Sequence, residues 1–407
     1  MIDIDRQALA DRMQIYFNPA INWDTVIALG SGLSEDAASF VAKEVRNRAF
    51  AMEKFQPDRL CRYAVRPFDT RWCYYSQVPS LWNRNRPPYW AQCWDGNEFL
   101  LSRFNQAKSP EGSPFYWTKH LSDDHFLAPD AVAFARETKP GVANLSTLTR
   151  NYLIVLGLPI PEHNAHIVDL PWLHALAIGY SPTYLEENAD GIGQDWPRIP
   201  LPDSKELLIA SAELGQQIAG LLDTEMQVPG VTSGFFLEPF RSIAVLSKVG
   251  GGQLQPDAGE LALAAGWGHA GKDNVTMPGK GKVIVRDYTS SELESIRLGA
   301  DRSRLSLDQV MEVLGEKTMD IYLNGIAYWC NIPEKVWEFT IGGYQVLKKW
   351  LSYREKFILK RDLLPEETQE ISAIARRLTA LCLLQPQLNT NYQNVKEKVS
   401  HMAIDKK

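Results

Sequence analysis

The hydrophobic periodicity changes twice along the chain, and this constrains the fold more than any other feature of the sequence. Apolar residues recur at helical spacing in 6–17 and 34–55, and Ser34, which two acidic residues follow, suits the start of the second helix. The segments 62–76 and 96–104 are strand-like instead, with prolines, asparagines and glycines between them. Helical and strand-like spacing each place apolar side chains on one face of the element. The sequence therefore predicts an α+β fold.

The middle of the chain contains predicted helices of its own. Helical spacing returns between 144 and 225, whereas 230–305 is again glycine-rich and strand-like. After 306 the chain is mainly helical, and Pro365 occupies a position typical of a first helical turn. A length of 407 residues exceeds the usual size of one core. We predict an N-terminal helical connector at 1–55, a β-rich domain at 56–305 with helices inserted at 144–225, and a C-terminal helical region at 306–407.

Composition and charge limit the classes of protein to which this chain can belong. The formal net charge of −6 argues against indiscriminate nucleic-acid binding, although a local basic groove remains compatible with it. No stretch approaches 18 uninterrupted apolar residues, and the charged N-terminal residues lack the apolar core of a signal peptide. We therefore expect a cytoplasmic protein with no membrane partner. The 5 cysteines never form a Cys-x-x-Cys pair, which favours reduced thiols over a metal site.

Two motifs resemble known cofactor or base-binding sequences without keeping the required geometry. Residues 266–271 match Gly-x-Gly-x-x-Gly, but proline and further glycines follow where a dinucleotide site needs a helix. Asn85 to Tyr89 resemble the Asn-Pro-Pro-Tyr of amino-group DNA methyltransferases, in which the asparagine binds the target amine. Arg86 separates the asparagine from the prolines here. We expect neither a dinucleotide site nor methyltransferase activity in this chain.

The histidines do not form a convincing metal or catalytic site either. His120 and His125 flank two aspartates on a polar loop, and the remaining candidates lie near prolines. Metal ligands need rigid elements and supporting hydrogen bonds, so ordinary surface or core roles are favoured. We therefore predict no catalytic residues, no metal and no cofactor.

Basic residues interleaved with aromatic residues are the positive functional signal. Between 59 and 108 there are 8 arginines and lysines but 3 acids, with 8 tyrosines and tryptophans among them. Arginine suits bidentate hydrogen bonds to guanine or phosphate. For Arg66 and Arg71 a structural role is favoured instead, in which Asp69 binds one of them.

Two further basic segments follow. In 269–286 lysines lie among glycines that let the backbone approach a ligand, although a solvated loop explains the pattern equally well. In 337–356 a glycine pair precedes a predicted helix whose lysines form a basic edge. The apolar face of this helix is expected to pack in the core, and its residues are Leu347, Trp350, Leu351, Arg354, Phe357 and Ile358.

Several longer blocks resemble a known family. They are YAVRPFDTRWCYY, PGVANLS, LHALAIGYSPTYLEENADGIGQDWPRIPLP and VWEFTIGGYQVLKKWLSYREKFILKRDL, in this order. Together they resemble the C-terminal target recognition region of type ISP restriction-modification enzymes and of related type IIG-like methyltransferase/helicase polypeptides. The resemblance extends over nearly the whole chain, and SPTYLEE, DWPRIPLP and IGGYQVLKKWL are its most specific parts.

The resemblance implies sequence-specific reading of double-stranded DNA in phage defence, and it makes 56–305 the target recognition domain. It also implies that adenine-N6 methyltransferase, helicase-like motor and nuclease modules are the partners that supply catalysis. The alternative is a scaffold that docks a methyltransferase or motor subunit with little DNA contact. The candidate DNA-contacting residues are Arg84, Asn85, Arg86, Tyr89, Arg103, Lys272, Asn274, Lys280, Lys282, Arg286, Lys348 and Lys349.

Overall fold

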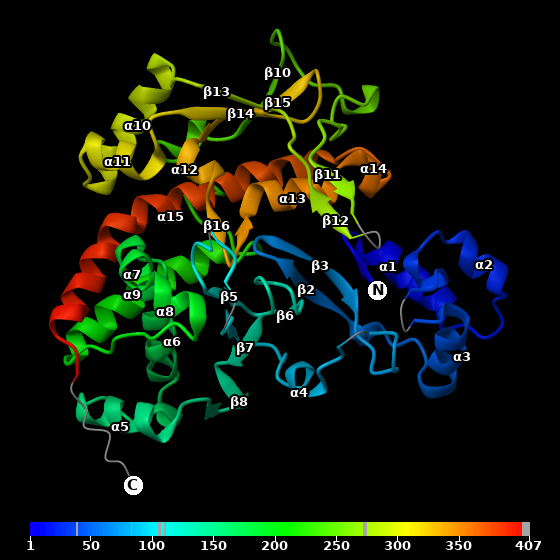
Figure 1. Ribbon diagram of the computed structural model, residues 1–407, viewed down its shortest axis with the longest axis horizontal. Helices are drawn as coiled ribbons and strands as arrows, with labels where there is room; N and C mark the ends of the chain where they lie inside the picture. Colours follow the sequence, from blue (N-terminus) through cyan, green and yellow to red (C-terminus); the bar gives the residue numbers. More distant parts are fainter. Residues whose placement is uncertain (38–39, 83, 105–106, 110, 272–274, 401–407) are drawn as a thin grey trace.

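The computed structural model describes residues 1–37, 40–82, 84–104, 107–109, 111–271 and 275–400. Helices and several small sheets alternate along the chain, so the predicted α+β class is confirmed (Figure 1). Lys272 and Asn274 lie outside the described residues. None of the helices in the described ranges combines the length and the apolar character that crossing a membrane requires.

The N-terminal helices pack against the first sheet around a small core of their own. They are α1 (Arg6–Tyr16), α2 (Trp23–Ala28) and α3 (Ala42–Met52), with a 3-10 turn at Gly32–Ser34. The prediction of one helix over 34–55 is wrong at its start, because α3 begins eight residues after Ser34. The carboxylate of Asp36 accepts a hydrogen bond from the Ala42 backbone N–H at 2.8 Å, so this acid marks the start of α3 from a loop.

The first sheet has the strand order β1-β3-β2-β6. Its strands are β1 (Ile2–Asp3), β2 (Leu60–Arg66), β3 (Asp69–Tyr74) and β6 (Leu121–Ser122). The hairpin β2–β3 confirms the strands expected in 62–76, and β6 joins β2 in parallel. A three-stranded sheet, β5-β4-β7, follows. The remaining elements of this region are η2 (Pro57–Arg59), α4 (Pro87–Trp90), β4 (Phe99–Ser102), β5 (Tyr116–Thr118), β7 (Val132–Ala135), β8 (Glu137–Lys139) and β9 (Val142–Ala143).

The helices expected between 144 and 225 are present. They are α5 (Thr147–Val155), η3 (Pro161–His163), α6 (Ala165–Gly179), α7 (Pro182–Glu187), α8 (Ala189–Gln194) and α9 (Lys205–Leu222). Helices α6 and α9 pack closely, because a Cβ atom at Gly215 would lie 1.9 Å from the Leu173 carbonyl oxygen. Only glycine fits at that crossing.

The second large sheet has the order β10-β15-β14-β13. This half of the chain comprises η4 (Phe240–Ser242), β10 (Val245–Lys248), η5 (Pro256–Ala258), β11 (Gly268–Ala270), β12 (Thr276–Pro278), β13 (Val283–Arg286), α10 (Ser290–Ser303), α11 (Leu307–Leu314), β14 (Thr318–Tyr322) and β15 (Ala327–Pro333). Two expectations are wrong here. Helix α10 lies in the range expected to be strand-like, and a capping box between Thr289 and Glu292 starts it. The strands β14 and β15 lie in the region expected to be helical.

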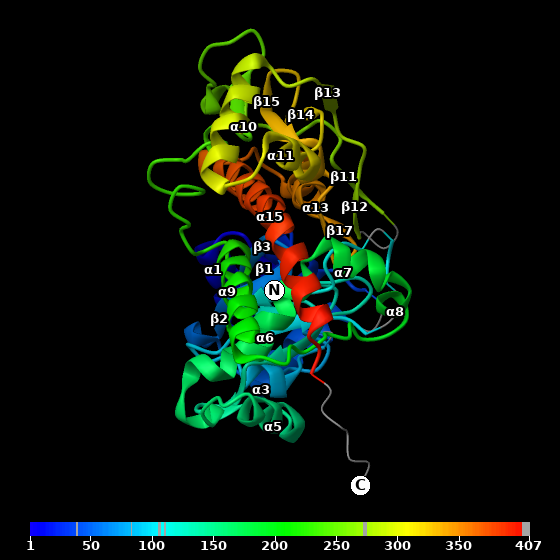
Figure 2. The ribbon, with the colours of Figure 1, turned by 90° about the vertical axis from the view of Figure 1, so that its left-hand side faces the viewer.

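The C-terminal elements are α12 (Glu334–Trp337), β16 (Thr340–Ile341), β17 (Tyr344–Gln345), α13 (Val346–Arg354), α14 (Lys356–Leu359) and α15 (Pro365–Glu397). Pro365 is at the start of α15, as predicted. Helix α15 contacts β10 and β15 of the second sheet and also α7 and α9. Figures 1 and 2 show it running beneath the second sheet toward the inserted helices. It therefore joins the two halves of the chain around one extended core.

Candidate nucleic-acid interface

The chain that follows β3 presents two of the predicted arginines beside an acidic loop. Arg84 Nε lies 3.2 Å from Asp124 Oδ2, and Arg86 Nη1 lies 3.1 Å from Asp124 Oδ1. The side chain of Arg84 is 60% exposed, and surface ion pairs contribute only about 0–1 kcal/mol. Arg86 is held more firmly, because its Nη2 also donates to the Ser122 carbonyl oxygen. Arg84 can therefore leave its partner for a ligand at little cost.

Arg86 has an unusual backbone conformation. Its φ of 41° is left-handed, which is rare for arginine and is found preferentially where a structure holds a functional residue in place. Its guanidinium lies 5.0 Å from the ring centroid of Tyr89. The Tyr89 hydroxyl donates to the His120 carbonyl oxygen at 3.1 Å, and Asn85 Nδ2 donates to the Gln77 carbonyl oxygen at 3.3 Å. Tyr89 is buried, so it supports the loop from within.

A glycine turn directs the helix that carries Lys348 and Lys349. Gly342 and Gly343 connect β16 to β17, and their φ values of 52° and 80° suit a type I′ turn that only glycine adopts readily. The glycine pair that precedes the predicted helix therefore forms a tight turn between two short strands.

The core face of α13 is only partly as predicted. Leu347, Trp350, Leu351 and Arg354 are buried. Phe357 is 65% exposed, because α13 ends at Arg354 and a new short helix begins at Lys356. The Glu355 carboxylate accepts a hydrogen bond from the Trp267 backbone N–H at 2.8 Å, and this contact holds the break in place.

Lys349 lies in a row of cations and tyrosines. Its Nζ is 4.5 Å from the ring centroid of Tyr353 and 5.6 Å from that of Tyr344. Arg66 lies 5.4 Å from the Tyr344 ring centroid and Arg71 lies 4.8 Å from that of Tyr353. In this row three cationic side chains alternate with two tyrosine rings, and the row connects α13 with the β2–β3 hairpin.

Burial, followed by the charge of Arg66, lowers the pKa of Lys349 to about 8. Lys108 and Arg71 act in the same direction, and Asp69 acts in the opposite one. In the described part of the chain no carboxylate lies within ion-pair distance of Lys349. The charge of Lys349 therefore lacks a direct counterion, which suits an incoming anion.

Asp69 and Asp123 fix the arginines of this row. Asp123 pairs with Arg66 at 2.8 Å, while Asp69 pairs with Arg71 at 2.6 Å and with Arg354 at 2.9 Å. Burial alone would raise the pKa of Asp69, but Arg354 and Arg71 lower it below its usual value. The structural role favoured for Arg66 and Arg71 is therefore correct, although Arg66 binds Asp123. Asp123 is next to Asp124, which binds Arg84 and Arg86. Through its ion pair with Arg66, Asp123 therefore connects the 84–86 loop to the row of side chains beside α13.

The hairpin β11–β12 packs against α13. A Cβ atom at Gly268 would lie 2.0 Å from the Ser352 carbonyl oxygen, and Lys349 Nζ donates to the Thr276 carbonyl oxygen at 3.4 Å. A strand pairing therefore occupies the place where a dinucleotide fingerprint would need a helix. Lys280 and Lys282 follow this hairpin and are exposed, and Lys282 Nζ lies 3.9 Å from the ring centroid of Tyr322.

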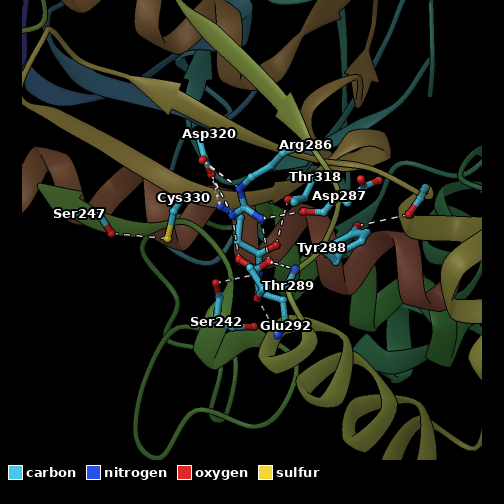
Figure 3. Close-up of polar contacts among 12 residues, drawn as sticks. Ser242, Ser247, Arg286, Asp287, Tyr288, Thr289, Glu292, Thr318, Asp320 and Cys330 are labelled. Atoms are coloured by element: carbon cyan, nitrogen blue, oxygen red, sulfur yellow. Dashed lines mark hydrogen bonds and ion pairs between the residues drawn. The ribbon is translucent and has the colours of Figure 1, made fainter. Parts of the chain in front are cut away.

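Two of the predicted arginines lie away from this surface. Arg103 is fully buried, donates to Glu111 and donates to the Ile192 carbonyl oxygen at 2.7 Å. Arg286 makes two hydrogen bonds of 2.8 Å with Glu292 and further ones of 3.0 and 3.1 Å with Asp320 (Figure 3).

The hydrogen bonds with Glu292, and then those with Asp320, raise the pKa of Arg286 above its ordinary value. Both guanidinium groups are occupied by acids of the chain itself. They hold elements together and are not presented to a ligand.

The histidines occupy separate positions. His120 Nε2 lies 3.2 Å from Glu225, and His125 Nδ1 lies 3.1 Å from Asp130. His174 is buried between Ser211 and the Pro200 carbonyl oxygen, and burial lowers its pKa to about 4. No three His, Cys, Asp or Glu side chains of the described ranges form a group that could hold a metal ion. All 5 cysteines are free, and the Cys61 and Cys73 sulfurs lie 3.4 Å apart.

We define the basic face as the 84–86 loop, α13 with Lys348 and Lys349, and the β11–β12 hairpin with Lys280 and Lys282. The structure brings these three predicted segments together, since α13 contacts β11 and β12 and the Arg66–Asp123 pair links α13 to the loop. The sequence did not single out Tyr344 and Tyr353. Their spacing of nine residues around Lys349 was a possible signal.

A family model describes the same arrangement of sequence blocks. The Type ISP C-terminal specificity domain matches residues 3–155 and 172–381. The chain belongs to this family. The resemblance inferred from the sequence is thereby confirmed. A comparison of the specificity domain with curated proteins found no match.

Solved structures share the fold of this specificity domain at low sequence identity. One is a nuclease-deletion mutant of the Type ISP restriction-modification enzyme LlaGI in complex with a DNA substrate mimic. Its sequence identity to this chain is 14% and the TM-score is 0.51, and the match covers 96% of this chain and 26% of the LlaGI chain. In the DrdV–DNA complex the protein is 15% identical with a TM-score of 0.54, and the match covers 96% of this chain and 34% of the DrdV chain. The ATP-dependent Type ISP restriction-modification enzyme LlaBIII bound to DNA is 14% identical with a TM-score of 0.50, and the match covers 95% of this chain and 21% of the LlaBIII chain. The specificity domain thus spans 21–34% of the length of these proteins.

Proposed function

We propose that this specificity domain reads a short sequence of double-stranded DNA for a Type ISP restriction-modification enzyme. The basic face is the observation that supports this most strongly. In the described residues no carboxylate lies within ion-pair distance of Lys280, Lys282, Lys348 or Lys349, although the chain carries a net charge of −6. Uncompensated cations gathered on one face of an acidic protein are the electrostatic footprint of a nucleic-acid site. The DNA complexes described for LlaGI, DrdV and LlaBIII support the same assignment.

The geometry suggests different roles for the members of the basic face. Arg84, whose side chain is 60% exposed, suits a bidentate contact to guanine in the major groove. Arg86 would read a base only by giving up its bonds to Asp124 and to the Ser122 carbonyl oxygen, and Asn85 lies between the two arginines. The lysines of α13 and those after β12 suit phosphate contacts, which position the protein on the duplex. Lys272 and Asn274 are proposed to extend the reading surface. Arg103, Arg286 and Tyr89 are assigned to the support of the fold.

We infer that catalysis belongs to other modules of the system. Adenine-N6 methylation, DNA cleavage and ATP-driven movement would be supplied by methyltransferase, nuclease and helicase-like partners in the cytoplasm. This domain matches only 21–34% of the length of LlaGI, DrdV and LlaBIII, and the remaining length leaves room for such modules.

The test is selection of a binding motif by the 407-residue chain from a random duplex library, at salt concentrations between about 50 and 200 mM. Enrichment of one motif supports the proposal. If the chain forms a complex with a methyltransferase module but enriches no motif, either alone or together with that module, the scaffold role is supported instead.

A further inference from the structure

One face of the β11–β12 hairpin packs against the protein. A Cβ atom at Gly268 would lie 2.0 Å from the Ser352 carbonyl oxygen and 3.0 Å from the side chain of Ile358, so the hairpin lies directly on α13 and α14. Pro278 is paired with Gly268 and therefore belongs to the same face. Figure 2 shows the hairpin outside α13, on one side of the molecule.

The other face of the hairpin exposes apolar side chains. Successive residues of a strand point to opposite faces, so the paired residues His269 and Met277 lie on the face away from α13. Met277 is 46% exposed, and Val275, two residues before it, is 58% exposed. A Cβ atom at Gly271 would lie 2.7 Å from Met277 Cγ, so this glycine leaves room for the methionine to lie across the hairpin.

Lysines adjoin this apolar face. Lys280 and Lys282 follow β12 by two and four residues and are exposed. Lys349 of α13 donates to the Thr276 carbonyl oxygen of β12 at 3.4 Å, and Lys348 precedes it on the helix. Lysine is depleted in protein–protein interfaces, whereas it is a common contact to DNA phosphates. The lysines therefore favour DNA over a protein as the partner of this face.

The shape of the hairpin favours the major groove of DNA. This groove is about 12 Å wide and admits a two-stranded β-ribbon, whereas the minor groove is about 6 Å wide. The apolar group that base pairs display in the major groove is the C5 methyl group of thymine. Apolar side chains that lie between phosphate-binding lysines on a β-ribbon are therefore suited to contact thymine.

We propose that Met277 and Val275 contact thymine methyl groups in the major groove and thereby determine part of the recognised sequence. The inference rests on the proposed function, because it takes the basic face as the DNA site. Burial of one methyl group strengthens binding roughly fourfold. The hairpin thus adds an apolar contact to the polar contact proposed for Arg84.

The experiment uses the duplex motif that the full chain selects. Each thymine is replaced in turn by uracil, which lacks only the methyl group, and affinities are measured by fluorescence anisotropy. We expect about fourfold weaker binding for uracil at the contacted positions. Met277→Ser and Val275→Thr, which keeps the shape of the side chain, should each reduce this ratio to about one at the position that the residue contacts. Met226→Ser, at a 48% exposed side chain beside α9, should leave the ratios unchanged.

The possible results separate the two proposals. A selected motif without thymine, or one that binds equally well with uracil at every position, overturns the methyl contact and leaves DNA recognition intact. A loss that Met277→Ser and Val275→Thr both leave unchanged places the methyl contact elsewhere and also overturns it. If these variants keep the uracil ratios but no longer form a complex with a methyltransferase module, the face binds a protein instead. Failure to bind any duplex overturns DNA recognition itself, and the methyl contact with it.

Discussion

Replacing Lys349 is expected to stabilise the fold and to weaken DNA binding at the same time. Burial and then Arg66 lower the pKa of this lysine from an ordinary value of 10.5 to about 8. At 1.36 kcal/mol for each unit of pKa, the charged form is disfavoured by roughly 3 kcal/mol. Solvent screening of a side chain that is only partly buried reduces the expected effect on stability to about 1–2 kcal/mol.

The sign of the effect on stability follows from proton linkage. Because the pKa of Lys349 is lower in the folded protein, the penalty is present in full below pH 8 and disappears as the pH rises from about 8 to 10.5. Lys349→Met should therefore raise the free energy of unfolding by about 1–2 kcal/mol at pH 7. Urea unfolding measures this difference, which should shrink when the experiment is repeated near pH 9.5.

Replacing Lys349 should weaken DNA binding, although it stabilises the fold. A phosphate beside Lys349 favours the charged form and returns its pKa toward 10.5, so binding at high pH requires uptake of a proton. With values of about 8 in the free protein and 10.5 in the complex, linkage predicts about tenfold weaker binding at pH 9 than at pH 7. Fluorescence anisotropy with a labelled duplex at constant ionic strength measures both affinities.

Two variants serve as controls. Lys349→Arg keeps its charge at both pH values and should bind equally well at pH 7 and pH 9. Lys349→Met should bind more weakly at both and lose the pH dependence. If the unmodified chain binds equally at pH 7 and pH 9, or if Lys349→Met keeps the slope, the contact between Lys349 and a phosphate is refuted.

Three further predictions concern other parts of the structure. Arg86→Ala should relax the preference at one base position by about 1–3 kcal/mol in the library selection, whereas a uniform loss of affinity with an unchanged motif would make Arg86 a phosphate contact. Asp69→Asn removes the nearest carboxylate from the buried charge of Arg354, which then has Glu370 at 3.8 Å, and should lower the free energy of unfolding by about 3 kcal/mol in urea. Because the pKa of Asp69 is lowered in the folded protein, the difference from the unmodified chain should shrink as the pH falls below about 4; a constant difference would contradict the ion pair. Gly268→Ala places a Cβ atom against the Ser352 carbonyl oxygen, so it should detach the β11–β12 hairpin and weaken DNA binding more than Gly325→Ala, where no atom lies within 4 Å; equal effects would contradict this packing.

The sequence predicted those elements whose residues determine their own local structure. Helices α1 and α9 follow from apolar spacing within one segment, and the turn at Gly342–Gly343 follows from two residues that accept positive φ. The start of α3 was missed because Asp36 caps it across a loop. The strands β14 and β15 were missed because they lie inside a region of mainly helical character, and their pairing with β10 and β13 stabilises them.

The candidate site was predictable only in part, for a similar reason. Three basic segments could be recognised as local runs of arginine and lysine, and they do lie together. Whether an individual arginine is available depends on acids far away in the sequence. Arg286 is occupied by Asp320, and Arg103 reaches the backbone of Ile192. Arg12, Ser31 and Trp82 lie around one cavity with Arg86 although they are far apart in the sequence, and no local pattern signals that meeting.

The most direct test of DNA recognition is the ratio of affinities for the selected duplex and for a scrambled duplex of the same composition, measured with the full chain. A specificity module should bind its motif at least about a thousandfold more tightly than other DNA at physiological salt. Substitution of Arg84 and Arg86 should lower this ratio, while substitution of Lys348 and Lys349 should lower both affinities and reduce their dependence on salt. A ratio near one for the unmodified chain would contradict the account.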